Sequence, residues 1–417
     1  MQLKTLKQAE AALQPFIPSV AEIVGRNITL ERMWPMMKIL GNPQKRLRIV
    51  HIAGTSGKTS TAYFLSSLLA ATGKKTALHV SPHIDKLTER TQINNKPITD
   101  ELFCEEMSIF LNIIYKHNLK PTYFELHTAF AYWFFERQKV DYVVMETGMG
   151  GLHDSTNVAN NADKICVITD IGLDHTNILG KTIPEITAQK AGIIHSHNAV
   201  FMYRQSDEVM RIIADHCKRL HAQLHELEQE SDANLTDLPL FQMRNFGLAK
   251  AVYEYIKEQD LLSSLSAEDL RQAAHIKIPA RMEIIKYKNK ILIMDGAHNE
   301  QKMQMFVKSF QTKFPNQKAV VLLSLKDSKD YKPIVDRLVP IDGQFITTTF
   351  ETSQDLPVRS MNSDLLAKYC NKKGVSAYSI TDHHQAFQTL MKSNSDLLII
   401  TGSFYLLYQL RGMEKII

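Results

Sequence analysis

The chain has 417 residues, of which 44% are hydrophobic and 22% charged, and its formal net charge is +5. This length exceeds the size at which one hydrophobic core stops growing, so two domains are expected, while four scattered cysteines without a Cys-x-x-Cys pair indicate neither disulfides nor a thiolate zinc site. The longest apolar run, Ala129 to Phe135, is too short to span a bilayer, and the basic residues form no stripe, so we predict a cytoplasmic protein with no membrane and no nucleic acid as partner.

The first predicted unit is a strand, a glycine turn and a helix. The run Leu47 to Ala53 (LRIVHIA) is apolar and branched, as in a buried parallel strand, and Thr61 to Leu69 has helical apolar spacing that ends before Gly73. The turn between them carries Gly54 and Lys58 in the stretch GTSGKTS. Backbone N–H groups at the positive end of a helix, with a lysine beside them, suit a triphosphate. The spacing is two residues shorter than the usual phosphate-loop pattern, so an ordinary glycine turn is the alternative for this segment alone.

Branched apolar runs then alternate with segments of helical spacing. This alternation predicts a parallel sheet that is covered on both faces, and ligands of such sheets gather at the carboxyl ends of the strands. The predicted strands are Lys75 to Val80, Asp141 to Met145 and Lys164 to Thr169, and the predicted helices are Thr99 to His117, Tyr123 to Arg137, Thr182 to Ile194 and Arg244 to Gln259.

A second, smaller α/β unit is predicted after the polar stretch Glu226 to Asp237, which is interpreted as a surface loop. The pattern restarts at Arg281 with a hairpin, MEIIKYKNKILIMD. We therefore predict domains at residues 1–278 and 279–417. The elements predicted in the second are helices at Glu300 to Phe314 and Leu365 to Asn371, and strands at Ala319 to Leu325, Gln344 to Thr349 and Leu397 to Thr401.

Polar residues follow two of the predicted strands. Glu146 ends one strand and is followed by a glycine-rich loop (METGMGGLHDSTN), so it can hold Mg²⁺ beside phosphates, or it can be a solvated glutamate before a loop. The next strand ends in TDIGLDHT, which contains His175, and the following helix carries Lys190. A lone histidine or lysine is usually structural. Because parallel strand ends converge on one crevice, Lys58, Glu146 and His175 together favour a shared Mg²⁺-ATP site.

Six segments occur in this order along the chain: HIAGTSGKTS, SPHIDKLTERTQINNKPIT, TYFELHTAFAYWFF, METGMGGLHDSTN, ITDIGLDHTNILGKTIPEITAQKAGII and MDGAHN. Together they resemble the folylpolyglutamate synthase and dihydrofolate synthase family of the Mur ligase superfamily. The resemblance runs from about Thr29 to Tyr405. It implies a Mur-ligase-like α/β fold, with a central phosphate-loop domain and a smaller Rossmann-like C-terminal domain. It also implies an ATP-dependent ligase in which a folate or pteroate carboxylate takes the γ-phosphoryl group and the amine of L-glutamate attacks the acyl phosphate.

The resemblance also assigns roles to residues. Lys58, His175 and Lys190 are expected to be catalytic, with Lys190 carbamylated to assist a second metal ion. Mg²⁺ is expected on Ser81, Glu146, His175 and Lys190, and ATP is expected to be shared between the domains. The residues expected to bind ATP are Gly54, Thr55, Gly57, Lys58, Thr59, Ser60, Asn245, Arg281 and Asp295.

The pterin side of the substrate is expected on three segments that lie far apart in the sequence. They are Asn27, Ile28, Thr29 and Leu30; Thr122, Tyr123, Phe124 and Glu125; and His153, Asp154 and Ser155. The sequence departs from the family's pattern at Ser56 and Thr59, which replace Asn and Gly, and at Glu300, which replaces a proline. The family's Gly-Gly-Arg-Leu-Asp also appears here as Gly-Gly-Leu-His-Asp, ending at Asp154, so an expected arginine is lost beside the pterin side.

Two other functions are compatible with the sequence. A Mur-type ligase could act on a cell-wall precursor or another carboxylate, and a non-catalytic nucleotide-binding module could keep the fold. The sequence does not choose between dihydrofolate synthesis, polyglutamylation or both, and a monomer is the expected oligomeric state. An ordinary lysine at position 190, paired at the surface with Glu185, is the alternative to the carbamate.

Overall fold

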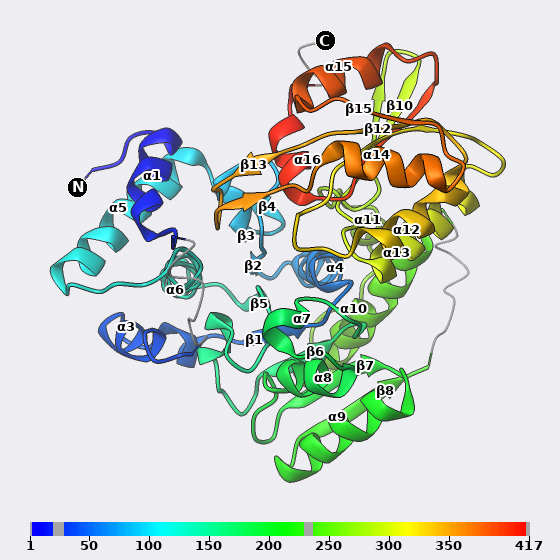
Figure 1. Cartoon of the computed structure of the whole chain (residues 1–417). Coiled ribbons are helices and arrows are strands. Elements are labelled where there is room, and N and C mark those ends of the chain that lie inside the picture. Colours follow the sequence, from blue (N-terminus) through cyan, green and yellow to red (C-terminus); the bar gives the residue numbers. More distant parts are fainter. Residues whose placement is uncertain (1, 20–28, 229–236, 414–417) are drawn as a thin grey trace. The chain divides into compact units, whose positions relative to one another are not determined.

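The computed structural model describes residues 2–19, 29–228 and 237–413 (Figure 1). The chain divides into two compact units. The first consists of Met1–Leu235 and Gln242–Ile276, and the second of Thr236–Phe241 and Lys277–Ile417. Within the described residues, no helix has the length and hydropathy that crossing a membrane requires.

The first unit is built on an eight-stranded sheet with the order β4-β3-β2-β5-β1-β6-β7-β8. The strands from β2 to β8 in this order pair in parallel, as predicted, but β3 pairs antiparallel with β2 and β4 pairs antiparallel with β3. This antiparallel edge corrects the purely parallel prediction. Asn94 and Asn95 explain it, because both adopt left-handed backbone conformations (φ 49° and 57°) that suit a tight hairpin turn. The strands are β1 Ile49–Ala53, β2 Thr76–His79, β3 Thr91–Ile93, β4 Lys96–Pro97, β5 Tyr142–Glu146, β6 Ile165–Ile168, β7 Ala199–Tyr203 and β8 Gln223–Leu227.

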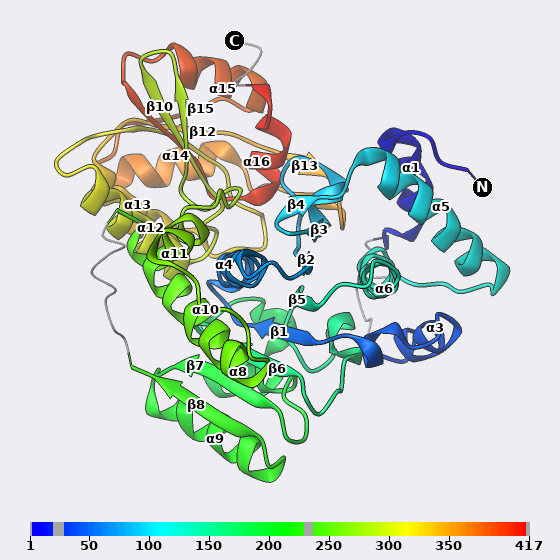
Figure 2. The same ribbon diagram turned by 180° about the vertical axis from the view of Figure 1, so that it is seen from behind.

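Helices cover both faces of this sheet, as predicted. On one face, α6 packs on β2 and β5 within one apolar cluster, and α8 and α9 pack on β6 and β7 within another. On the other face lie α4, α10 and α11, and α10 passes in front of β6 and β7 in Figure 2. The helices of this unit are α1 Leu6–Leu13, α3 Met33–Ile39, α4 Lys58–Ala71, α5 Asp100–Lys116, α6 Tyr123–Arg137, α7 Thr176–Leu179, α8 Ile183–Ala191, α9 Asp207–Arg219, α10 Leu240–Gln259 and α11 Ala267–Ala274.

The second unit has a six-stranded sheet with the order β15-β12-β11-β16-β10-β9, in which only the β9–β10 hairpin is antiparallel. Helices α12, α13 and α14 share an apolar cluster with one face, and α15 and α16 pack on the other. A two-stranded ladder is formed by β13 Glu351–Thr352 and β14 Val358–Arg359. The remaining elements are β9 Glu283–Tyr287, β10 Lys290–Asp295, β11 Val320–Leu323, β12 Phe345–Thr347, β15 Ala377–Ser379, β16 Leu397–Thr401, α12 Glu300–Lys313, α13 Tyr331–Leu338, α14 Ser363–Lys372, α15 His383–Lys392 and α16 Phe404–Leu410.

The prediction of a surface loop from Glu226 to Asp237 is wrong at its start. Glu226 and Leu227 lie in β8 instead, because their backbones pair with Met202 and Tyr203 of β7. Residues 229–236 of that stretch lie outside the described residues. Edge strand β8 is only half-buried, so its sequence is polar and lacks the apolar run that signals a buried strand.

Candidate active site

The glycine turn lies between β1 and α4, as predicted. Gly57 caps α4 in the left-handed region (φ 94°), where a side chain is strained. A Cβ atom on Gly54 would lie 1.8 Å from Oγ1 of Thr169, and one on Gly57 would lie 2.5 Å from Oδ1 of Asn245. The turn therefore has no room for side chains at either glycine, and the Asn245 side chain lies directly against Gly57.

Two lysines meet at the carbonyl oxygen of Gly54. Nζ of Lys58 donates to this oxygen at 3.1 Å, and Nζ of Lys190 donates to it at 2.8 Å. Lys190 is only 3% exposed, so the alternative of a surface ion pair with Glu185 is wrong. Glu185 instead caps the first turn of α8, where its carboxylate accepts from Lys181 and Thr182. The fold thus brings two lysine side chains from different helices to the phosphate loop.

Glu146 lies at the carboxyl end of β5 and is 2% exposed. Its Oε1 accepts a hydrogen bond from the hydroxyl of Thr59 at 2.7 Å, and its Oε2 accepts the backbone N–H of Ser81 at 3.4 Å. A carboxylate and the hydroxyl of Thr59 thus come together beside the loop, and such oxygen atoms are the kind of ligand that Mg²⁺ takes. Within the described ranges, no group of three or more His, Cys, Asp and Glu could hold a metal ion. That is compatible with Mg²⁺, which commonly uses one or two carboxylates together with substrate phosphates.

His175 follows β6 and adopts a left-handed conformation (φ 50°) at the start of α7. Its side chain is 44% exposed, and its Nε2 lies 3.9 Å from Oδ1 of Asp174. Strands β5 and β6 flank β1 on either side, so Glu146, the phosphate loop and His175 follow three adjacent strands at the same edge of the sheet. This is the arrangement that the sequence predicted.

Two of the residues predicted to bind ATP are engaged or enclosed within the protein. The backbone N–H of Thr55 donates to Asp170 O at 2.8 Å, and its hydroxyl donates to Gly172 O at 2.9 Å. Ser60 is buried in the first turn of α4. Thr55 therefore ties the loop to the end of β6.

Side-chain hydrogen bonds connect the three segments predicted to hold the pterin. Glu125 of α6 accepts from Thr122 in a capping box and receives the forked guanidinium of Arg32, with Nη2 at 2.7 Å from Oε1. Arg32 lies two residues after Leu30, whereas Asn27 and Ile28 lie outside the described residues. Ser155 in the third segment shares a hydrogen bond of 2.7 Å with Thr128 of α6.

The loop of the third segment has a buried carboxylate at its centre. Asp154 accepts from the backbone N–H of Met149 and from both the N–H and the hydroxyl of Thr156. Burial raises the pKa of Asp154 above its usual range. His153 beside it is exposed, whereas Phe124 packs so closely on Gly148 that a Cβ there would lie 2.3 Å from its ring.

Arg281 and Asp295 lie in the second unit. The guanidinium of Arg281 stacks on the ring of Phe404 at 4.4 Å. Asp295 accepts the backbone N–H groups of Met282 and Ala297 at 2.7 and 2.8 Å, and burial raises its pKa to about 6. Arg281 therefore lies just before the β9–β10 hairpin, and Asp295 lies at its end.

Comparisons with known proteins match both units. The Mur ligase middle domain matches residues 52–264, and the glutamate ligase domain of Mur ligases matches residues 280–404. The dihydrofolate synthase/folylpolyglutamate synthase of Bacillus subtilis is 32% identical over 93% of this chain and 95% of its own length. The chain belongs to this family. The dihydrofolate synthetase of Saccharomyces cerevisiae, another relative in it, is 30% identical over 90% of this chain and 95% of its own length.

Solved structures of family members share the fold. The folylpolyglutamate synthase of Mycobacterium tuberculosis, complexed with ADP, matches with a TM-score of 0.82 and 24% identity over 98% of both chains. The bifunctional synthase of Yersinia pestis, complexed with AMPPNP and Mn ion, matches with the same TM-score of 0.82 and 24% identity, again over 98% of both chains.

The sequence did not assign several residues of this chain to the site, and only the structure shows them there. Arg32, Thr128 and Arg244 contact predicted site residues or the phosphate loop's neighbours, but they lie outside the motifs or inside ordinary helical patterns. Asp170 had a signal, since it follows a strand directly at the edge where ligands gather. Its partner Arg244 is 74 residues away, so the sequence could not pair them.

Proposed function

We propose that the chain is an ATP-dependent ligase that joins the amine of L-glutamate to a folate or pteroate carboxylate through an acyl phosphate. The observation that carries this proposal is the convergence at one sheet edge of the phosphate loop, two lysines on Gly54 and the buried Glu146. Family membership supports the acceptor, because the relatives' names cover both dihydrofolate and folylpolyglutamate synthesis.

The nucleotide's phosphates are proposed to lie at the N-terminus of α4. Lys58 would neutralise charge on the transferred phosphoryl group, because it projects from the first residue of the helix beside the glycine turn. Backbone N–H groups at the positive end of the helix dipole would add to this binding. Arg281 and Asp295 are proposed to contact the nucleotide from the second unit. The complexes of two structural relatives with ADP and with AMPPNP support a nucleotide as the ligand.

Glu146, Ser81 and His175 are proposed to hold Mg²⁺. Bound there, the metal would neutralise charge that develops on the phosphates. The chain's own contribution is a fixed carboxylate: Thr59 and Ser81 both donate to Glu146 and so hold its two oxygen atoms in place.

Lys190 is proposed to carry a carbamate, as the resemblance implies. Its deep burial beside Lys58 supports this, because two ammonium groups on one carbonyl oxygen repel each other, whereas a carbamate would pair with Lys58. Carbamate oxygen atoms would also suit a second Mg²⁺.

The pterin is proposed to bind where the Thr29–Leu30, Thr122–Glu125 and His153–Ser155 segments meet. The Arg32–Glu125 pair and the Thr128–Ser155 hydrogen bond support this, since they hold the three segments together before any substrate binds.

Substrate-dependent phosphate release tests the proposed function. The protein is incubated with ATP, glutamate and Mg²⁺, with dihydropteroate, tetrahydrofolate or a nucleotide-linked muramyl peptide as acceptor in separate reactions, and mass spectrometry identifies each product. Turnover with either folate acceptor, or with both, supports the proposal. Turnover with the muramyl peptide alone would identify a cell-wall ligase, and ATP binding without glutamate-dependent turnover would identify a non-catalytic module.

A monomer is also proposed, and sedimentation equilibrium measures it directly. The cytoplasmic location stays a prediction from the sequence.

A further inference from the structure

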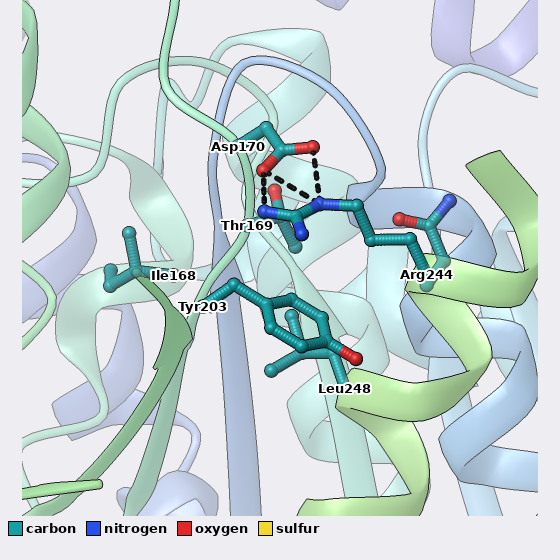
Figure 3. A pocket seen from close by; sticks show the side chains of 7 residues that line it. Ile168, Thr169, Asp170, Tyr203, Arg244 and Leu248 are labelled. Carbon is teal, nitrogen blue, oxygen red and sulfur yellow. Dashed lines mark hydrogen bonds and ion pairs between the residues drawn. The ribbon is translucent and has the colours of Figure 1, made fainter. Parts of the chain in front are cut away.

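An ion pair beside the phosphate loop is not used by the proposed chemistry. Arg244 of α10 forks onto the carboxylate of Asp170 at the end of β6, with Nε at 3.2 Å from both oxygen atoms and Nη2 at 2.8 Å from Oδ1 (Figure 3). The guanidinium also lies over the ring of Tyr203 at 4.2 Å. The Arg244 side chain is 17% exposed, so the fork is fixed by packing as well as by charge.

Both ends of this pair reach the phosphate loop. The backbone carbonyl of Asp170 accepts the N–H groups of Thr55 and Ser56 at 2.8 and 3.1 Å. At the other end, the residue after Arg244 is Asn245, whose side chain lies against Gly57. Asp170, Arg244 and Asn245 line one pocket. The other residues that line it are Ile168, Thr169, Tyr203 and Leu248. The ion pair therefore connects the two structures that hold the loop, the end of β6 and helix α10.

The charge of Asp170 gives the pair a second effect. A carboxylate next to a phosphate loop repels the phosphates of a nucleotide, and this repulsion is weakly screened where the group is partly buried. The Asp170 side chain is 31% exposed. Arg244 neutralises it with a bidentate contact, so the loop keeps the anchoring carbonyl of Asp170 without the repulsion of its side chain.

We propose that Arg244 and Asp170 form a positioning pair for nucleotide binding, which holds the phosphate loop and Asn245 in register and cancels the carboxylate charge beside the loop. Neither residue needs to touch the nucleotide. This inference rests on the proposed nucleotide site and adds two positioning residues to it.

A double-mutant cycle, with ADP affinity as the measured quantity, tests the Arg244–Asp170 pair. Arg244→Gln leaves an unpaired carboxylate beside the loop, so ADP affinity by isothermal titration calorimetry should fall about tenfold. Asp170→Asn removes the charge and should weaken ADP by about threefold or less. Because removing both partners leaves no unpaired charge, the double variant should bind ADP about as well as Asp170→Asn, which restores part of the affinity lost in Arg244→Gln.

Arg137 provides a matched control in the same unit. It forks onto Glu106 at 3.0 and 3.2 Å and stacks on Trp133 at 4.7 Å, so it copies the chemistry of Arg244 away from the loop. Arg137→Gln should lower thermal stability about as much as Arg244→Gln and leave ADP affinity unchanged. In steady-state assays, Arg244→Gln should raise KM for ATP and leave KM for the folate acceptor within about twofold of wild type.

Three outcomes would overturn the proposal. They are ADP affinity within twofold of wild type in Arg244→Gln, an equal loss in Arg137→Gln, and a double variant that is weaker than Arg244→Gln. If Arg244→Gln does not fold, Arg244→Lys, which keeps the charge but loses the fork, gives the same decision with a smaller loss. ADP binding needs no acceptor, so absence of folate turnover in the wild type would contradict the proposed function and leave this result valid.

Discussion

A buried lysine donates to a backbone carbonyl at each of two edges of the eight-stranded sheet, the edge where the parallel strands end (the carboxyl edge) and the edge where they begin (the amino edge). At the carboxyl edge, Lys190 is 3% exposed and donates to Gly54. At the amino edge, Lys164 directly precedes β6, is fully buried and donates to Ala159 at 2.6 Å. Burial and partner type are therefore alike, and neither distinguishes the lysine of the proposed site from a structural one.

The surroundings of the two lysines differ. Around Lys164, side-chain amides satisfy backbone carbonyls: Asn161 donates to Gln44 and Leu47, and Asn198 donates to Asn161. Around Lys190 lie a second lysine, a buried carboxylate and a turn whose glycines leave the backbone open. The edge proposed to bind ligands thus combines charged side chains with a glycine turn, whereas at the other edge side-chain amides bind backbone carbonyls.

The largest effect on turnover is expected for Lys58→Ala. The ammonium acts by charge on the transferred phosphoryl group, so kcat should fall about 10³-fold. Because Lys58 is partly exposed and donates to the backbone carbonyl of Gly54, a contact with little effect on packing, the melting temperature should change little. Steady-state kinetics and thermal unfolding measure the two effects, and a folded variant with wild-type kcat would contradict the phosphate assignment.

Lys190→Ala should reduce kcat by about 10²-fold or more, because it removes the proposed carbamate. Short carboxylic acids such as acetate or formate should restore part of the rate by supplying the missing oxygen atoms, and they should not restore Lys58→Ala. Wild-type turnover in Lys190→Ala would exclude the carbamate, and so would an unmodified amine in crystals grown with bicarbonate.

Glu146→Gln should raise the Mg²⁺ concentration for half-maximal rate about tenfold and lower kcat. An amide is a poorer ligand than a carboxylate for a hard cation, yet its oxygen can still accept from Thr59, so the loop keeps this contact. Titration of activity with Mg²⁺ measures the change. An unchanged Mg²⁺ requirement would place the metal elsewhere.

The smallest effect on activity is expected for Lys164→Met, which should leave kcat unchanged and alter stability. Burial lowers the pKa of Lys164 from its usual 10.5 to about 8. Between these pH values the unfolded chain binds more protons than the folded one, so wild-type stability rises with pH. Lys164→Met lacks this rise. Its free energy of unfolding relative to wild type should therefore be highest below pH 8 and decline by about 3 kcal/mol toward pH 10.5.

Urea unfolding of both proteins at pH 7 and pH 10 measures this difference. A relative stability that does not change with pH would show that Lys164 titrates normally in the folded protein. A large loss of kcat would show that the amino edge contributes to the reaction and would remove the distinction between the two edges.

The sequence by itself determined the parts of the protein whose signals are contiguous. The strand, glycine turn and helix around Lys58 formed as predicted, because apolar spacing and glycine conformation act within a few residues. The same holds for α5 and α6, whose caps Thr99 and Thr122 accept from backbone N–H groups three residues on. Strand ends carrying Glu146 and His175 were also predictable, since parallel strands end at a common edge.

Only the tertiary structure decided which side chains meet. Lys190 and Gly54 are 136 residues apart, Arg32 and Glu125 are 93 apart, and Arg244 and Asp170 are 74 apart. Such pairs depend on strand order, register and helix rotation, which are set by burial of the whole core and leave no mark in either local segment. The half-buried strand β8 escaped for the same reason: its conformation is fixed by the neighbouring strand rather than by an apolar pattern of its own.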